Sequence, residues 1–149
     1  MFNFACYMPT IGDEYVFNNI QKEIDRGLKE KKILDASIFY DQVGKIDTKN
    51  VKCGLFPSTD AWHFKGKMFV VSPAMGLKMI NIVNDINVYF GHGWGSKNVL
   101  SLLYTKEKTK FKTIASSEEY YEDYKRLTGE KPEGIAPDFK NLIDIMSKE

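Results

Sequence analysis

Short apolar runs alternate with longer amphipathic stretches along this chain of 149 residues. The clearest short run, Lys67–Ser72, is apolar enough to form a strand that is buried on both faces. The clearest amphipathic stretch begins at Asp13 or Glu14 and continues to about Lys32, with its apolar side chains at helical spacing. Strands and helices that alternate in this way predict a parallel sheet with helices packed against it.

The same pattern places the remaining elements. The predicted strands are Asn3–Met8, Asp35–Asp41, Val51–Phe56, Lys67–Ser72, Asn87–Gly91 and Lys110–Ala115. The predicted helices are Asp13–Lys32, a short one over Pro57–Phe64, Met75–Val83 after Pro73, Ser96–Tyr104, Glu118–Leu127 and Phe139–Ser147. Pro9 and Gly12 are expected to stop the first strand, and Gly129 to close the helix that Ser116 or Ser117 caps. We therefore expect one doubly wound, Rossmann-like α/β domain over residues 1–149, with a mostly parallel sheet of about six strands and helices on both faces.

The composition is that of a globular protein, with 43% hydrophobic residues, 28% charged residues and a net charge of +1. A net charge so close to zero argues against a general nucleic-acid or membrane-surface binder. The first residues lack the regions of a signal peptide, and no apolar run approaches the ~20 residues that span a bilayer. Cys6 and Cys53 follow no metal-ligand spacing. We expect a cytoplasmic protein that holds no metal and no cofactor.

The glycine-rich loop after the fifth predicted strand carries the strongest chemical signal. Its candidate residues are His92, Gly93, Gly95, Ser96 and Lys97. The glycines leave room for a ligand beside the backbone, and the serine would cap the next helix. The lysine adds positive charge beside the free N–H groups of that helix, which favour an anion. The histidine is the candidate for proton transfer, although a structural turn in which it bonds a neighbouring carbonyl is the alternative.

Two further loops are expected at the same crevice, because the carboxyl ends of parallel strands meet at one edge of a sheet. Thr10 and Gly12 follow the first strand, and Ser72 ends the fourth. Their hydroxyl and amide groups would contact a polar ligand. Asp13 more readily caps the helix that follows it.

Common nucleotide-binding and hydrolytic motifs are missing from the sequence. The glycine spacing differs from G-x-G-x-x-G and from a P-loop, and neither a G-x-S-x-G elbow nor a carboxylate cluster for metal-assisted hydrolysis is present. In Asp60–Phe64, Trp62 and Phe64 would stack on a base or sugar, or else pack on the core. The alternating lysines of 106–112 are typical of a solvated edge.

A set of short motifs follows in order through the second half of the chain. A strand ends in His92-Gly93 with Lys97 shortly afterwards, a second strand ends in Ser116-Ser117-Glu118, and a helix finishes at Leu127-Thr-Gly129. With the segment Lys131–Phe139, this order resembles the end of the N-terminal domain of two-domain, GT-B type glycosyltransferases. Within that superfamily it is most similar to the CDP-glycerol glycerophosphotransferases.

The resemblance covers about Lys67–Phe139 and implies the following roles. His92 would be a general base or a phosphate contact, Ser116 would lie at the ligand crevice, and the Pro9–Gly12 loop would line its acceptor side. In that superfamily a second domain holds most of the nucleotide-sugar donor. The segment Lys131–Phe139 would lead toward it, so either a protein partner supplies that domain or the fold serves another purpose, such as binding, interference or a reduced enzyme.

The leading hypothesis is therefore a glycosyltransferase-like domain that binds a sugar, a nucleotide sugar or a phosphate-bearing small molecule. In its enzymatic form, His92 removes a proton from an acceptor hydroxyl while the amides at Ser96 and Lys97 stabilise phosphate charge. The alternative is a non-catalytic module that binds a nucleotide-like molecule or a protein. Exposed aromatic residues would then matter more than the histidine, namely Trp62, Trp94 and Tyr120.

Overall fold

The computed structural model describes residues 1–12, 14–46, 51–73, 75, 79, 86–94 and 99–148. At its centre is a six-stranded, fully parallel sheet in the order β3-β2-β1-β4-β5-β6. The strands are β1 (Phe2–Ile11), β2 (Ile33–Val43), β3 (Gly54–Pro57), β4 (Gly66–Val70), β5 (Ile86–His92) and β6 (Lys112–Ala115). Strands β2 and β3 lie on one side of β1, and β4, β5 and β6 lie on the other. This is the arrangement of a Rossmann-like sheet, which confirms the predicted fold class.

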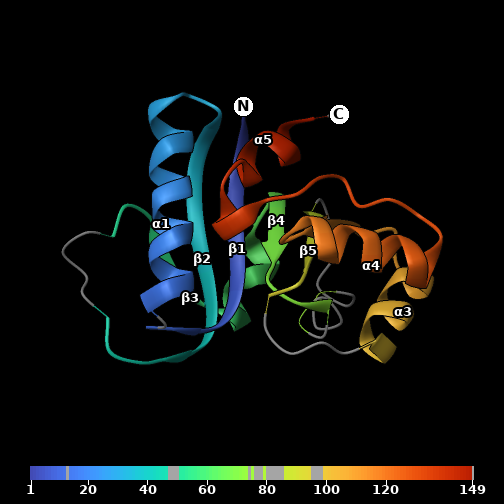
Figure 1. Cartoon of the computed structure of the whole chain (residues 1–149). Helices are drawn as coiled ribbons and strands as arrows, with labels where there is room; N and C mark the ends of the chain where they lie inside the picture. The colour runs from blue at the N-terminus through green and yellow to red at the C-terminus, as the bar shows by residue number, and fades with distance from the viewer. Residues whose placement is uncertain are drawn as a thin grey trace.

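Helices cover both faces of this sheet. The described ones are α1 (Glu14–Lys29), η2 (Ser58–His63), α3 (Val99–Lys108), α4 (Glu118–Thr128), η3 (Pro137–Phe139) and α5 (Leu142–Ser147), of which η2 and η3 are 3-10 helices. The chain moves through α1 toward one edge of the sheet and through η2 and α3 toward the other. Right-handed crossovers therefore place α1 on the face opposite η2 and α3. Figure 1 shows α1 running alongside the long strands β1 and β2, with both chain termini at the same end of the sheet.

Strand β1 continues through Pro9, although the sequence predicted that Pro9 would stop it. The pairing explains the difference. β1 pairs with β4 only as far as Tyr7, whereas its pairing with β2 continues to Ile11. Pro9 therefore lies on a stretch of β1 that has lost one neighbour, where a missing N–H donor is tolerated.

The helix predicted over Phe139–Ser147 is interrupted. Asp138, Phe139 and Asn141 all have positive φ angles, so η3 ends at Phe139 and α5 starts only at Leu142. By contrast, α4 matches its prediction. Ser117 accepts a hydrogen bond from the Tyr120 N–H at its start, and Gly129 takes a left-handed conformation at its end. The predicted helix Met75–Val83 lies mostly outside the described residues.

The segment Lys131–Phe139, which the resemblance assigned to a link toward a second domain, packs against the sheet. The N–H of Glu133 donates to the Thr113 carbonyl over 2.7 Å, and the N–H of Ala136 donates to the Ala115 carbonyl over 2.9 Å. Beyond it, α5 is fixed to α1, because the buried carboxylate of Glu23 accepts a hydrogen bond from the Ile143 N–H over 2.9 Å. This return path brings η3 over the carboxyl end of the sheet near the start of α1.

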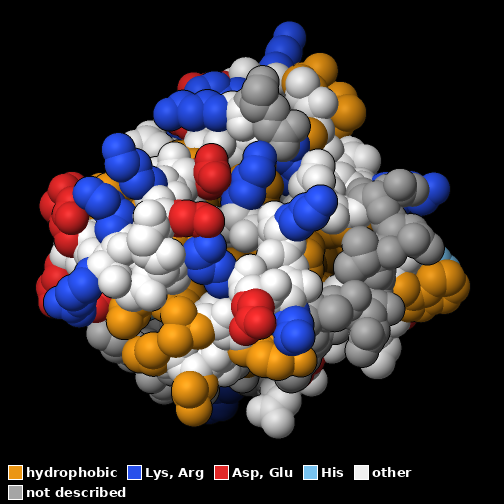
Figure 2. All heavy atoms as spheres, turned by 90° about the vertical axis from the view of Figure 1, so that its right-hand side faces the viewer, with side chains coloured by type: hydrophobic (Ala, Val, Ile, Leu, Met, Phe, Trp, Pro, Cys, Tyr) orange, Lys and Arg blue, Asp and Glu red, His pale blue; other side chains and the backbone are white. Residues whose placement is uncertain are grey.

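No helix in the described part of the chain is long and apolar enough to cross a membrane. On the face that includes α3 and α4, Figure 2 shows basic side chains with acidic ones among them. In the lysine run of 106–112, Lys106 pairs with Glu130 and Lys112 lies over the Tyr89 ring.

Candidate functional site

The strand order places a crevice between the carboxyl ends of β1 and β4. The chain leaves β1 toward β2 on one side and returns to β4 on the other, so no crossover helix fills the gap between them. A cavity of about 560 Å³ lies at this point. Its described lining comes from the ends of four strands, the start of α1 and η3. These residues are Pro9, Thr10, Tyr15, Val16, Val71, Gly93, Trp94, Ser116 and Asp138.

An indole forms one wall of this switch-point cavity. Trp94 is 8% exposed, stacks on Phe139 with 4.8 Å between ring centroids, and meets the edge of Phe69. Gly91 makes this position possible, because a Cβ there would lie 2.4 Å from the indole and 2.7 Å from the Val71 carbonyl oxygen. Trp94 was expected among the exposed aromatic residues. Its ring is instead held by the core and presents only part of its surface to the cavity.

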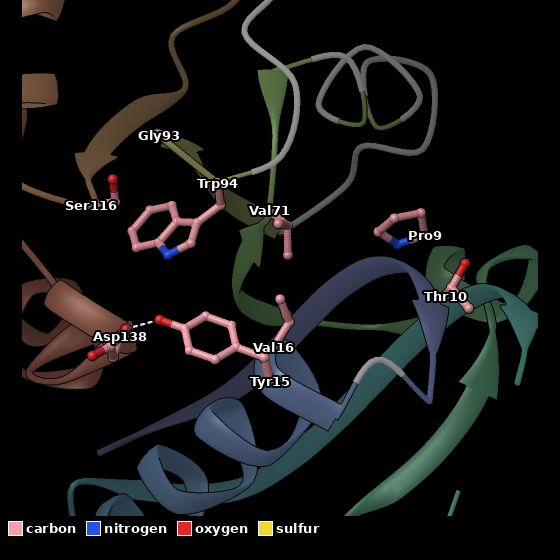
Figure 3. Close-up of a pocket in the computed structure, with 9 residues that line it drawn as sticks. All are labelled: Pro9, Thr10, Tyr15, Val16, Val71, Gly93, Trp94, Ser116 and Asp138. Atoms are coloured by element: carbon pink, nitrogen blue, oxygen red, sulfur yellow. Dashed lines mark hydrogen bonds between the residues drawn. The ribbon is translucent and has the colours of Figure 1, made fainter. Parts of the chain in front are cut away.

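A phenol and a carboxylate form the opposite side of the cavity. Tyr15 projects from the first turn of α1, and its hydroxyl donates a hydrogen bond to the carboxylate of Asp138. Figure 3 shows the Tyr15 ring near the Trp94 indole, with Asp138 beyond its hydroxyl. Among the described lining residues, Asp138 is the only acidic or basic side chain. A ligand here meets aromatic faces and one carboxylate.

Close backbone approach shapes the third side, where β5 and β6 end. Gly93 has a φ of +111°, and a Cβ at this position would lie 2.0 Å from Ser116 Oγ and 2.7 Å from the Tyr120 ring. The Ser116 N–H donates to the His92 carbonyl over 3.0 Å, which holds the two strand ends together. Only glycine fits both the backbone angle and the space, so Gly93 lets Ser116 reach the cavity.

The imidazole of His92 lies in the interior of the protein. His92 is 4% exposed, and its Nε2 is 2.8 Å from Oδ2 of Asp123 on α4. The Tyr120 ring packs edge-on against the imidazole, and Arg126 donates to the other oxygen of Asp123. His92 is not among the described residues that line the switch-point cavity. Because a general base must reach the proton it removes, this arrangement gives His92 a structural role and leaves its catalytic role a prediction.

The structure brings together three of the predicted site residues and separates others. Thr10, Gly93 and Ser116 line the cavity. Gly12 instead packs closely against Gly44, with a φ of +113°. Ser72 follows Val71 but is not among the described lining residues. The loop residues Gly95, Ser96 and Lys97 lie outside the described part of the chain.

Sequence reasoning missed Tyr15, Val16, Val71 and Asp138 as cavity residues. Tyr15 and Asp138 are 123 positions apart, and no local pattern connects them. Asp138 lies in the segment that the sequence analysis assigned to a link toward a second domain, and only the structure shows that Phe139 beside it is buried in the core. Within the described residues, no group of three or more His, Cys, Asp or Glu side chains is placed to hold a metal ion.

No family model, curated protein or solved structure matches this chain.

Proposed function

We propose that this chain is a glycosyltransferase-like domain that binds a sugar, or the sugar part of a phosphate-bearing ligand, in the switch-point cavity. One observation carries the proposal, namely the lining chemistry of that cavity. The rings of Trp94 and Tyr15 offer apolar faces to a sugar ring, while Thr10, Ser116 and Asp138 offer groups that bond its hydroxyls. This combination suits a neutral polyhydroxylated group better than a purely apolar one.

The charge of the cavity favours the sugar over the phosphate as the group held by the described residues. Asp138 would repel a phosphate, whereas its carboxylate accepts hydrogen bonds from sugar hydroxyls. The phosphate of a nucleotide sugar would then be contacted by Gly95, Ser96 and Lys97. That contact is a prediction from sequence.

Binding without transfer is the second candidate function, and the position of His92 favours it. The imidazole hydrogen-bonds to Asp123 and is almost completely buried. In an enzymatic form, another base would have to act in its place, and Asp138 is the carboxylate at the cavity. In this enzymatic form, a partner protein would supply the second, donor-binding domain.

Thermal unfolding with added ligand tests the proposal, because a ligand that binds only the native state raises the melting temperature. The panel contains free hexoses, sugar phosphates, nucleoside diphosphates and nucleotide sugars. We expect stabilisation by at least one sugar-containing compound. It should be lost in Asp138→Asn and weakened in Thr10→Ala, whereas Glu122→Gln and Thr59→Ala, which lie outside the cavity lining, should respond as the wild type does.

The outcomes separate the alternatives. No stabilisation by any hexose, sugar phosphate or nucleotide sugar would contradict the proposal. Stabilisation by nucleoside diphosphates, without added stabilisation by the attached sugar of a nucleotide sugar, would favour a nucleotide-binding module. With a ligand identified, turnover that survives in His92→Gln but not in Asp138→Asn would assign the base to Asp138.

A further inference from the structure

A second cavity of about 400 Å³ lies between β2, β3 and η2, away from the switch point. Its described lining consists of three phenylalanines and three polar residues, Ser37, Phe39, Phe56, Asp60, His63 and Phe64. Of the two aromatic residues that the sequence suggested for stacking, Phe64 lines this cavity and Trp62 is not among the described lining residues. Trp62 is 64% exposed and stacks on His63 instead of packing on the core.

The sheet register creates the aromatic part of this pocket. Phe39 on β2 and Phe56 on edge strand β3 are direct partners, and their ring centroids are 5.9 Å apart. Phe64 follows η2, and its ring meets that of Phe39 at 6.0 Å and 69°. Three rings from three segments therefore line one cavity, with Phe39 in contact with both of the others.

Two glycines fix the positions of the outer rings. A Cβ at Gly54 would lie 2.5 Å from the Phe56 ring, and one at Gly66 would lie 3.0 Å from Cζ of Phe64. Each ring thus lies directly over backbone that has no side chain. At the start of η2, the Ser58 hydroxyl donates to Asp41 on β2 over 2.6 Å, which anchors the helix that carries Asp60. The pocket is therefore built before any ligand arrives.

Asp60 adds a negative charge to this aromatic pocket. In the part of the chain that the structure describes, its carboxylate has no hydrogen-bond or ion-pair partner, although it lines the cavity. The faces of aromatic rings attract cations through their quadrupole, and quaternary ammonium groups are recognised in aromatic cages of this kind. Asp60 is exposed, so its carboxylate keeps contact with water while it lines the cavity, and it would repel an anion and attract a cation.

We propose that the pocket formed by Phe39, Phe56, Phe64 and Asp60 binds a small organic cation with an alkylated ammonium group. The rings contact the methyl groups, and the carboxylate supplies the counter-charge. This site is separate from the switch-point cavity and does not depend on the function proposed for it.

Isothermal titration calorimetry with choline chloride tests the proposal. The matched probe is the neutral isostere of choline in which a quaternary carbon replaces the nitrogen. We expect saturable binding of choline and binding of the isostere that is weaker by about tenfold, since a ring–cation contact contributes about 0.5–2 kcal/mol. Asp60→Asn and Phe56→Ala should each weaken choline binding by about fivefold or more.

Control variants keep the result interpretable. Phe56 is 41% exposed, so its removal should leave the fold intact, which circular dichroism checks. Tyr104→Ala removes an exposed ring on α3 and Glu133→Gln removes a negative charge away from the pocket, and both variants should bind choline as the wild type does. Absence of binding in the folded wild type, or equal binding of choline and its isostere, would overturn the proposal.

The same chemistry can be carried by a lipid or a peptide. Vesicles of phosphatidylcholine and a blocked trimethyllysine are therefore titrated in parallel. Tighter binding of either than of choline, with loss in Asp60→Asn, supports the site and identifies the source of its cation.

Discussion

Replacing Gly93 with alanine tests how tightly the switch-point cavity is built. The substitution adds a single methyl group, but it places that group 2.0 Å from Ser116 Oγ and 2.7 Å from the Tyr120 ring. It also imposes a φ of +111° on a residue with a side chain. Both effects act at the junction of β5, β6 and α4.

The expected destabilisation is the sum of these two effects. A left-handed backbone costs a residue with a side chain about 1–2 kcal/mol. An extra carbon in a closely packed site costs about 1–3 kcal/mol. The free energy of unfolding should therefore fall by about 2–5 kcal/mol, a large part of the roughly 5–15 kcal/mol typical of a domain.

Gly129→Ala is the matched control, because Gly129 also has a positive φ, of +77°, but no atom lies within 4 Å of its Cβ position. Urea unfolding followed by circular dichroism should show a loss of about 1–2 kcal/mol for this control. The double variant Gly93→Ala/Ser116→Ala should lose less than the sum of its single variants, since the closest clash is gone. If Gly93→Ala were no less stable than Gly129→Ala, the close approach of Gly93 to Ser116 would be refuted.

Three further predictions concern buried or charged groups away from the cavity. Asp123→Ala should lower the free energy of unfolding by about 1.5–3 kcal/mol because it leaves the buried His92 without its carboxylate, whereas Glu122→Ala should change it by less than about 0.5 kcal/mol in the same urea assay. Burial alone would raise the pKa of Asp144, but the hydrogen bond from Lys32 and the charge of Arg26 lower this pKa below its usual 3.8. The ionised Asp144 carboxylate therefore stabilises the fold fully above pH 3.8, and this stabilisation is lost as the pH falls through the pKa of the folded state. The urea midpoint should consequently drop more steeply in the wild type than in Asp144→Asn between about pH 5 and pH 2.5, and equal slopes would contradict this assignment. Burial raises the pKa of the Cys6 thiol, so iodoacetamide should label it only after unfolding, and mass spectrometry of peptides labelled under native conditions checks this.

The fold class was predictable because each of its elements has a local signal. Helix α1 buries one face, and its apolar residues therefore recur at helical spacing. Strand β4 buries both faces, and its sequence is therefore a continuous apolar run. The caps of α4 are equally local, since Ser117 and Gly129 act on backbone groups within one turn. The prediction that β1 stops at Pro9 was wrong for a physical reason. A strand tolerates proline where a neighbouring strand has ended, and the length of the neighbours is a property of the whole sheet.

The candidate site was predictable only in part. Thr10 and Gly93 were identified because each lies at the end of a predicted strand, and the carboxyl ends of parallel strands meet, whereas Ser116 was identified through the resemblance. His92 also follows that rule, yet side chains alternate along a strand and its ring met Asp123 on α4 rather than the cavity. Rules based on strand ends give the place of the backbone but not the direction of the side chain.

The sequence by itself determined the alternation of strands and helices and the edge of the sheet at which the switch-point cavity lies. Local burial patterns, caps and glycines are sufficient for that, because each acts over a few residues. Only the tertiary structure decided the contact of Tyr15 with Asp138, the stacking of Trp94 on Phe139 and the aromatic pocket beside Asp60. These contacts join segments that are distant along the chain, and the packing of the whole core, not any local preference, determines which of them meet.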